Sequence, residues 1–203
     1  MAHNLTQTDE FIPPELLGLS QPITVEQFGE ICSRYDDLRL ELTSSGELII
    51  MPPTGLLTGK RNLDLTYQLA AWYREHGSGV CFGADAGFTL PNGAIRGPDA
   101  SWVRREKWDS LTEQQKDSVA PICPDFVVEL RSKTDRLPVL FNKMTEYLAN
   151  GASLGWLIDP STRQVYVYRP DEEVVVLDNP ESVSGDPLLP GFKLNLAELW
   201  SVD

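Results

Sequence analysis

The sequence predicts an α/β sandwich, in which helices cover a central β-sheet. Three observations support this class. Residues 124–131 read Pro-Asp-Phe-Val-Val-Glu-Leu-Arg, and their apolar centre is typical of a strand buried on both faces. Two segments with helical apolar spacing, residues 60–76 and 136–150, alternate with strand-like segments. Residues 154–158 add a second apolar strand directly after the second of these helices.

Composition limits the organisation and location of the chain. The 203 residues, of which 41% are hydrophobic and 23% charged, suit one globular domain. We expect an irregular lead-in over residues 1–20, where Pro13 and Pro14 lie, and a single domain over residues 21–203. No apolar run is long enough to cross a membrane, and the N-terminus has no signal-peptide pattern. The three cysteines are widely spaced, so we expect reduced thiols in a cytoplasmic protein.

Histidine content and charge narrow the chemistry. The only histidines are His3 and His76, which argues against histidine-based zinc sites and Ser-His-Asp catalysis. Any metal would be a hard ion with oxygen ligands, such as Mg²⁺ or Mn²⁺. The net charge of −13 argues against broad, non-specific affinity for nucleic acid.

The first half of the chain is expected to open with a helix over residues 25–34, because Thr24 and Gln27 have the spacing of a capping box. Ser44-Ser45-Gly46 is the expected turn of a hairpin. A charged excursion over residues 104–120 should hold a short helix capped by Ser110. The other expected elements are hairpin strands at 38–43 and 47–51, a helix at 60–76, and strands at 79–83, 87–90 and 99–103.

The second half is organised around the two apolar strands. Pro138 suits the first turn of the helix over residues 136–150, and Gly151 suits its end. Trp156 is expected in the core, because it falls within an apolar strand. The remaining expected elements are a hairpin of residues 165–168 with 174–177, an extended segment at 192–194 and a short helix at 196–200.

Acidic residues at the strand ends are the first candidates for a site. Side chains alternate along a strand, so Asp125 and Glu129 share a face, but four residues separate them by about 13 Å. One cation cannot bind both, and Asp125 is interpreted as a turn residue after Pro124. Asp99 begins another strand and can reach Glu129 if the two strands are neighbours.

Basic residues near Glu129 supply candidates for charge stabilisation. Arg131 lies on the same strand face as Glu129 and stays protonated, so it could stabilise a phosphate but not act as a base. Lys143 lies on the flank of the following helix, and an ordinary surface lysine is the alternative interpretation. Lys133 and Arg136 are further candidates that the sequence leaves open.

These residues resemble a known superfamily. Asp99 and Glu129-x-Arg131, with a lysine on the next helix, are similar to the PD-(D/E)XK nucleases, with the lysine moved from strand to helix. Within that superfamily the chain resembles the bacterial Uma-type family of restriction endonucleases over roughly residues 20–200. The matching segments are residues 48–55, 97–103, 124–132, 143–151 and 155–160.

The resemblance implies a restriction-endonuclease-like core, with a mixed central sheet flanked by helices and an N-terminal helix and hairpin as additions. It implies Asp99 and Glu129 as ligands of Mg²⁺ or Mn²⁺, Lys143 as the catalytic lysine, and DNA as substrate, with a homodimer as one arrangement. Arg131 occupies the place of the superfamily's strand lysine. The first core helix has no acidic residue near its centre, and Glu47 is the candidate replacement.

Three functions remain open from the sequence. The first is a metal-dependent endonuclease that hydrolyses DNA phosphodiester bonds. The second is a catalytically inactive nuclease fold that binds nucleic acid or a protein partner, with Glu129–Lys143 or Asp99–Arg131 as structural ion pairs. The third is a phosphoesterase with an enclosed pocket for a small molecule. An NTPase is rejected, because residues 55–61 depart from the phosphate-loop pattern.

Overall fold

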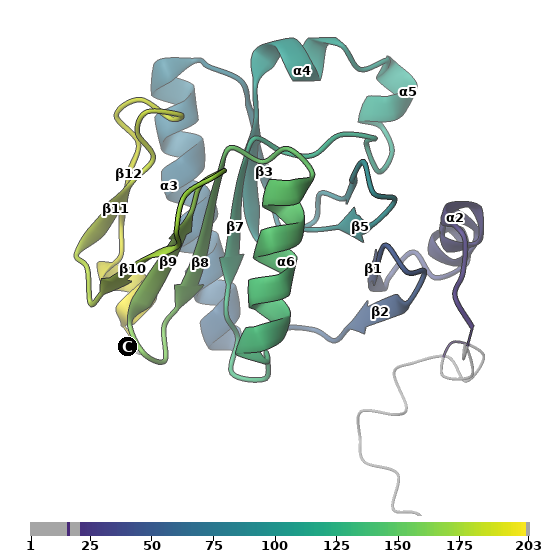
Figure 1. The fold of residues 1–203 in the computed structure, drawn as a ribbon, viewed down its shortest axis with the longest axis horizontal. Helices are drawn as coiled ribbons and strands as arrows, with labels where there is room; N and C mark the ends of the chain where they lie inside the picture. The colour runs from purple at the N-terminus through teal and green to yellow at the C-terminus, as the bar shows by residue number, and fades with distance from the viewer. Residues whose placement is uncertain (1–15, 17–20, 202–203) are drawn as a thin grey trace, which may run out of the picture.

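The computed structural model of the chain describes residue 16 and residues 21–201. Its centre is a six-stranded sheet with α6 on one face and α3 on the other (Figure 1). The strand order is β10-β9-β8-β7-β6-β3. These strands are β3 (Val80–Gly83), β6 (Ala100–Val103), β7 (Phe126–Leu130), β8 (Leu154–Asp159), β9 (Gln164–Tyr168) and β10 (Val175–Asp178). The pair β7 and β8 is parallel and the other pairs are antiparallel, so the predicted mixed sheet is confirmed.

The two faces of the sheet bury different clusters. Phe126 and Val128 of β7 pack with the apolar residues of α3 (Leu56–His76). Val127 points to the opposite face and packs with those of α6 (Leu137–Ala149). Trp156 is fully buried, as expected. Because side chains alternate between the two faces of a strand, the sheet presents a separate apolar surface to each helix.

Helix α3 begins earlier than the sequence predicts. It starts at Leu56 instead of residue 60, so most of the segment considered as a phosphate loop is helical. Its end is as expected, because Gly77 adopts the left-handed conformation (φ 67°) that closes a helix. Helix α6 ends at Ala149, and its C-cap is Asn150 rather than the predicted Gly151.

The N-terminal elements form a second, smaller sheet. Helix α2 (Val25–Arg34) has the predicted capping box of Thr24 and Gln27. The hairpin β1 (Arg39–Leu42) and β2 (Leu48–Met51) is antiparallel, also as predicted. The hairpin joins β4 (Phe88–Thr89) and β5 (Ile95–Arg96) in the order β2-β1-β5-β4. Strand β5 was not predicted, because two residues are too few to show an alternating pattern.

The remaining segments cover the ends and edges of the larger sheet. The excursion after β6 holds α4 (Arg105–Asp109) and α5 (Glu113–Lys116). The cap predicted at Ser110 is wrong: Thr112 and Gln115 form the capping box of α5, while the Ser110 hydroxyl donates to the Lys107 carbonyl. The chain closes with β11 (Ser182–Ser184), β12 (Lys193–Asn195) and α7 (Ala197–Trp200), and Figure 1 shows β11 and β12 beside α3.

Two expectations concern the whole chain. The lead-in predicted over residues 1–20 lies, except for Leu16, outside the described residues. None of the helices in the described part of the chain has the length and apolar character needed to span a bilayer.

Candidate functional site

Strands β6 and β7 bring the two predicted carboxylates together. They are antiparallel, and Ala100 pairs with Val128, so Asp99 lies next to Glu129 at the same end of the sheet. Asp99 Oδ2 accepts a 2.7 Å hydrogen bond from the backbone N–H of Leu130. The expectation that the two strands are neighbours is therefore confirmed.

Two side chains of α6 hold the carboxylate of Glu129 in place. It is only 4% exposed, and its Oε1 accepts hydrogen bonds from Lys143 Nζ (2.8 Å) and from the hydroxyl of Tyr147 (3.0 Å). Lys143 and Tyr147 are four residues apart on α6, so they point to the same side of that helix. Among the described residues, no donor contacts the other oxygen of Glu129, Oε2. The carboxylate is thus fixed through one oxygen and leaves the other available.

Lys143 connects two carboxylates. Its Nζ lies 2.8 Å from Glu129 Oε1 and 2.8 Å from Glu41 Oε1, and its side chain is 11% exposed. It is therefore not an ordinary surface lysine. The Glu129–Lys143 ion pair, considered from the sequence as a structural pair, is present.

Glu41 is the acidic residue that the sequence reasoning missed. It lies on β1, is 3% exposed, and also accepts hydrogen bonds from the Gly97 N–H (2.9 Å) and from Arg96 (3.2 Å). Glu47, the candidate replacement, is exposed on the hairpin, and it is Glu41 of this hairpin that binds Lys143. The alternation of Leu40, Glu41 and Leu42 is typical of a polar outer face, and only the fold brings that face against α6.

The first core helix supplies an amide to the site instead of an acid. Asn62 of α3 donates from Nδ2 to Asp99 Oδ1 at 3.0 Å. From the sequence, only acidic residues on this helix were considered as candidates, so Asn62 was not predicted. Asp99 thus receives one donor from α3 and one from the backbone of the neighbouring strand.

The other predicted basic residues lie around this centre. Arg131 binds Asp159 (2.7 Å) and Ser161 (3.2 Å) through Nη1 and does not form the ion pair with Asp99 that was considered. Lys133 and Arg136 are exposed in the turn and at the helix cap between β7 and α6.

Asp125 lies at the opposite end of β7 from Glu129. It is buried and binds Arg104 (3.1 Å) and Lys107 (3.0 Å). It is therefore more than the turn residue that was expected, but the structure agrees with its exclusion from the site. Its ion pairs tie the start of β7 to the excursion after β6.

Burial and charge shift the pKa values at the site. Burial raises the pKa of Glu129 to about 7; Lys143 opposes this shift, while the negative charges of Asp99 and Glu41 add to it. Burial likewise raises the pKa of Asp99. Burial also acts to raise the pKa of Glu41, but Lys143, the Gly97 N–H and Arg96 outweigh it and lower that pKa. Burial therefore disfavours the ionised forms of Asp99 and Glu129, although Lys143 acts in the opposite direction on both.

The donor set suits a hard divalent cation. Within residues 16 and 21–201, no three His, Cys, Asp or Glu side chains form a ready metal cluster. Asp99 and Glu129 nevertheless offer carboxylate oxygens, of which Glu129 Oε2 lacks a donor. Burial is the main cause of their raised pKa values, and a bound cation would stabilise both carboxylates in the ionised form. Glu41 is saturated by its own donors, so it fits a role beside Lys143 better than a place among the ligands.

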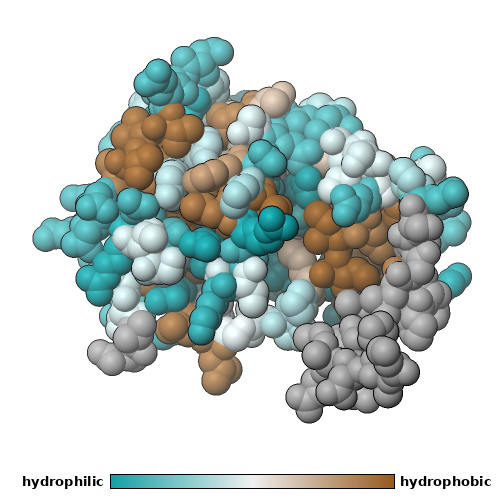
Figure 2. Space-filling model, turned by 60° about the horizontal axis from the view of Figure 1, so that its bottom comes forward, coloured by the Kyte–Doolittle hydropathy of each residue, from teal (hydrophilic) through white to brown (hydrophobic). Residues whose placement is uncertain are grey.

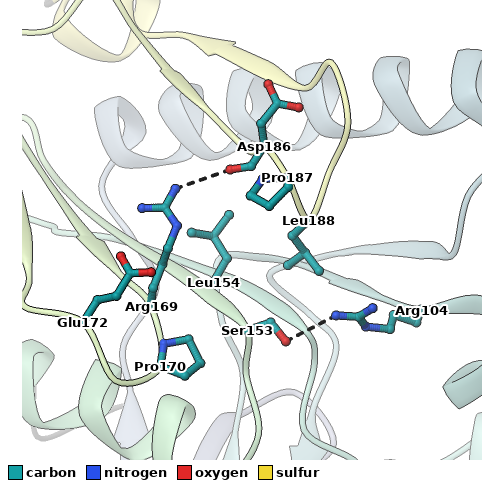
Figure 3. Close-up of a pocket in the computed structure, with 9 residues that line it drawn as sticks. All are labelled: Arg104, Ser153, Leu154, Arg169, Pro170, Glu172, Asp186, Pro187 and Leu188. Carbon is teal, nitrogen blue, oxygen red and sulfur yellow. Dashed lines mark hydrogen bonds between the residues drawn. The ribbon is translucent and has the colours of Figure 1, made fainter.

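A separate cavity lies away from these carboxylates. It has a volume of about 430 Å³, and Figure 3 shows Arg104 and Arg169 directed toward its interior. Leu154 on its wall pairs with Phe126, at the start of β7, whereas Glu129 lies near the end of that strand. The cavity therefore gives no support to an enclosed phosphoesterase site around Asp99 and Glu129.

Comparisons with known proteins identify the fold and the family of the chain. A solved structure described as a putative nuclease belonging to DUF820 from Anabaena variabilis ATCC 29413 is similar, with a TM-score of 0.73. It is 21% identical, and the alignment covers 88% of this chain and 98% of that chain, which shows a shared fold. A comparison with curated proteins finds no match. The Uma2 family model, described as "Putative restriction endonuclease", matches residues 25–197, and the chain therefore belongs to this family.

Proposed function

We propose that the protein is a nuclease that hydrolyses DNA phosphodiester bonds with the help of Mg²⁺ or Mn²⁺. The observation that carries this proposal is the convergence of Asp99, Glu129 and Lys143 at one end of β6 and β7. Membership of a family described as restriction endonucleases supports the same reaction class.

Asp99 and Glu129 would hold the cation. When bound there, such an ion polarises the phosphate and lowers the pKa of a coordinated water. Lys143 supplies a positive charge beside the carboxylates. Burial alone would lower its pKa, but Glu129 and Glu41 raise it above the ordinary lysine value. Lys143 therefore acts as a proton-bearing group that positions water or stabilises developing phosphate charge.

Arg131 is included in the proposal as a second phosphate-stabilising group. Its Nη1 is engaged by Asp159 and Ser161, and its Nε donates to the Asp135 carbonyl. Among the described residues, none forms a hydrogen bond or ion pair with its Nη2. The guanidinium is therefore held in a fixed orientation with one nitrogen left for a substrate oxygen.

The second candidate is a catalytically inactive module that binds nucleic acid or a protein partner. The observation that favours it is the buried Glu129–Lys143 ion pair, in which Lys143 already supplies a positive charge to Glu129 without a cation. Binding of Mn²⁺ separates the two candidates, because an inactive module held by this pair has no need of the ion.

The decisive experiment is cleavage of supercoiled and single-stranded DNA with Mg²⁺, Mn²⁺ or EDTA. We expect metal-dependent cleavage by the wild type, its loss in Glu129→Ala, and its retention in Glu113→Ala, which changes an exposed carboxylate on α5. Cleavage that survives in Glu129→Ala would contradict the site. A wild type inactive on both DNAs would favour the inactive module.

Location and assembly complete the proposal. Cys32, Cys81 and Cys123 are free thiols, which suits the reducing cytoplasm of a bacterium. A homodimer would allow two sites to meet the two strands of a duplex, and light scattering of the purified protein tests it.

A further inference from the structure

Asn62 has an oxygen atom that the fold buries without a partner. Its Nδ2 donates to Asp99 Oδ1 at 3.0 Å, while its Oδ1 is buried and accepts no hydrogen bond. Four buried side-chain atoms in the described part of the chain share this condition. The other three belong to Arg61, Ser101 and Trp156, none of which is hydrogen-bonded or ion-paired to a site carboxylate within the described residues. Asn62 is thus the member of this group that belongs to the site.

The orientation of the amide is set by its neighbour. Exchanging the nitrogen and oxygen of Asn62 would place its carbonyl oxygen against the carboxylate of Asp99, where no hydrogen bond can form. Asp99 therefore holds Nδ2 toward itself and leaves Oδ1 to face something else. A buried carbonyl without a donor costs about 1–3 kcal/mol, which is reason to expect a partner that the chain does not supply.

The distances allow that partner to be the cation. The two terminal atoms of an amide are about 2.2 Å apart, so Asn62 Oδ1 lies within about 5 Å of Asp99 Oδ1. Ligand bonds of 2.0–2.6 Å let one cation bind two oxygens that are at most about 4–5 Å apart, so Oδ1 and Asp99 can share a cation over the shorter part of this range. An amide also adds a hard oxygen ligand without adding negative charge. This matters here because the three carboxylates of Asp99, Glu129 and Glu41 already outnumber the positive charge of Lys143.

We infer that Asn62 Oδ1 is a third oxygen ligand of the divalent cation held by Asp99 and Glu129. This inference rests on the proposed function for the existence of that cation. Helix α3 then contributes to the metal site through a neutral ligand and also orients Asp99 through Nδ2. The same side chain thus links the helix to the ends of β6 and β7.

The experiment measures metal binding rather than cleavage. Binding of Mn²⁺ is followed by the electron paramagnetic resonance signal of the free ion, and water molecules on bound Eu³⁺ are counted from luminescence lifetimes in H₂O and D₂O. We expect Asn62→Ala to bind Mn²⁺ about tenfold more weakly or worse. We also expect it to hold one more water on Eu³⁺ than the wild type. Gln68→Ala, on the same helix but bonded to Asp64 and Asn195, should change neither quantity.

A second variant separates the two functions of the side chain. Asn62→Asp keeps an oxygen but loses the N–H group that orients Asp99. We expect its Eu³⁺ to hold the same number of waters as the wild type. The Asn62→Asp variant also keeps the inference testable if Asn62→Ala fails to fold, which circular dichroism would reveal.

Three outcomes overturn the inference. Unchanged Mn²⁺ affinity in Asn62→Ala means that Oδ1 faces something other than the cation. Weaker affinity with an unchanged water count means that Asn62 acts only by orienting Asp99. A wild type that binds no Mn²⁺ overturns both this inference and the metal dependence of the proposed function. A wild type that binds Mn²⁺ but cleaves no DNA contradicts the nuclease proposal alone.

Discussion

Lys143 shows how neighbouring charges decide the state of a single side chain. A lysine buried alone tends to lose its proton, because burial disfavours the charged form. Here Glu129 and Glu41 each lie 2.8 Å from Nζ and raise its pKa instead. Glu41 keeps its own charge, since Lys143, the Gly97 N–H and Arg96 lower its pKa against the effect of burial. The proton therefore stays on the lysine.

Replacing Glu41 should change the pH dependence of cleavage. In Glu41→Gln, Lys143 loses one of its two carboxylates, so its pKa falls, although Glu129 still supports it. If Lys143 must be protonated, its contribution to activity is complete below its pKa and is lost as pH rises through that pKa. We therefore expect the alkaline limb of kcat to shift to lower pH by about one unit or more, from the loss of one charge-assisted contact.

Glu146→Gln is the matched control for this shift. Glu146 binds Arg96 at 2.6 Å, as part of the same network, but it does not contact Lys143. Its pH profile should match that of the wild type. An unshifted alkaline limb in Glu41→Gln, with folding confirmed by urea denaturation, would show that Glu41 does not set the charge of Lys143.

Local signals explain which site residues the sequence predicted. Asp99 and Glu129 could be predicted because each lies at the end of a buried strand, where a carboxylate is unusual. Lys143 could be predicted from its position on the flank of a helix. Glu41 and Asn62 gave no such signal. Glu41 lies on the polar side of an ordinary alternating strand, and its partner Lys143 is 102 residues away. Asn62 is an unremarkable helix residue until Asp99 is placed beside it.

At the scale of elements, the closeness of α6 to the sheet depends on one glycine. A Cβ atom at Gly155 of β8 would lie 2.5 Å from Met144 Cε and 3.4 Å from Val127 Cγ2. Met144 is fully buried, so its terminal methyl group has little room to move. Because Met144 and Lys143 are adjacent in α6, the same contact positions the lysine beside Glu129.

Gly155→Ala should therefore destabilise the protein by overpacking. We expect a loss of about 1–3 kcal/mol in the free energy of unfolding, measured by urea denaturation. Gly29→Ala is the matched control: a Cβ at Gly29, inside α2, meets nothing within 4 Å. There the change should stabilise the protein by about 0.5–1 kcal/mol, because alanine favours a helix. Equal effects of the two substitutions would show that α6 can shift away from β8 without cost.

Elements differ in how well a sequence pattern predicts them. Helices α2, α3 and α6 span two or more turns, so their apolar faces and caps could be recognised. Strand β5 has two residues and β11 three, which is too short for alternation to be seen. The pairing of β1 with β5 also depends on a contact between Leu42 and Ile95, far apart in the chain. Such long-range pairing leaves no local signal.

At the scale of the whole molecule, negative charge opposes the proposed substrate. The chain carries a net charge of −13, and the site itself has more carboxylates than cations. Figure 2 shows strongly hydrophilic residues between separate apolar patches on one face, without a single continuous apolar surface. The cations near the site are also engaged, since Lys143, Arg96 and Arg131 all form ion pairs. DNA therefore needs an additional positive charge to approach Asp99 and Glu129.

A divalent cation should supply that charge, so DNA binding should depend on it. We expect the wild type to bind a short duplex about tenfold more tightly or better with Ca²⁺, which prefers the same oxygen ligands, than in EDTA at equal ionic strength. Fluorescence anisotropy measures both affinities. The gain should vanish in Glu129→Ala, which loses a ligand, and persist in Glu113→Ala, whose carboxylate is exposed on α5. Equal affinity in Ca²⁺ and EDTA would mean that the protein binds DNA through a surface other than this site. A gain that persisted in Glu129→Ala would place the cation elsewhere on the molecule.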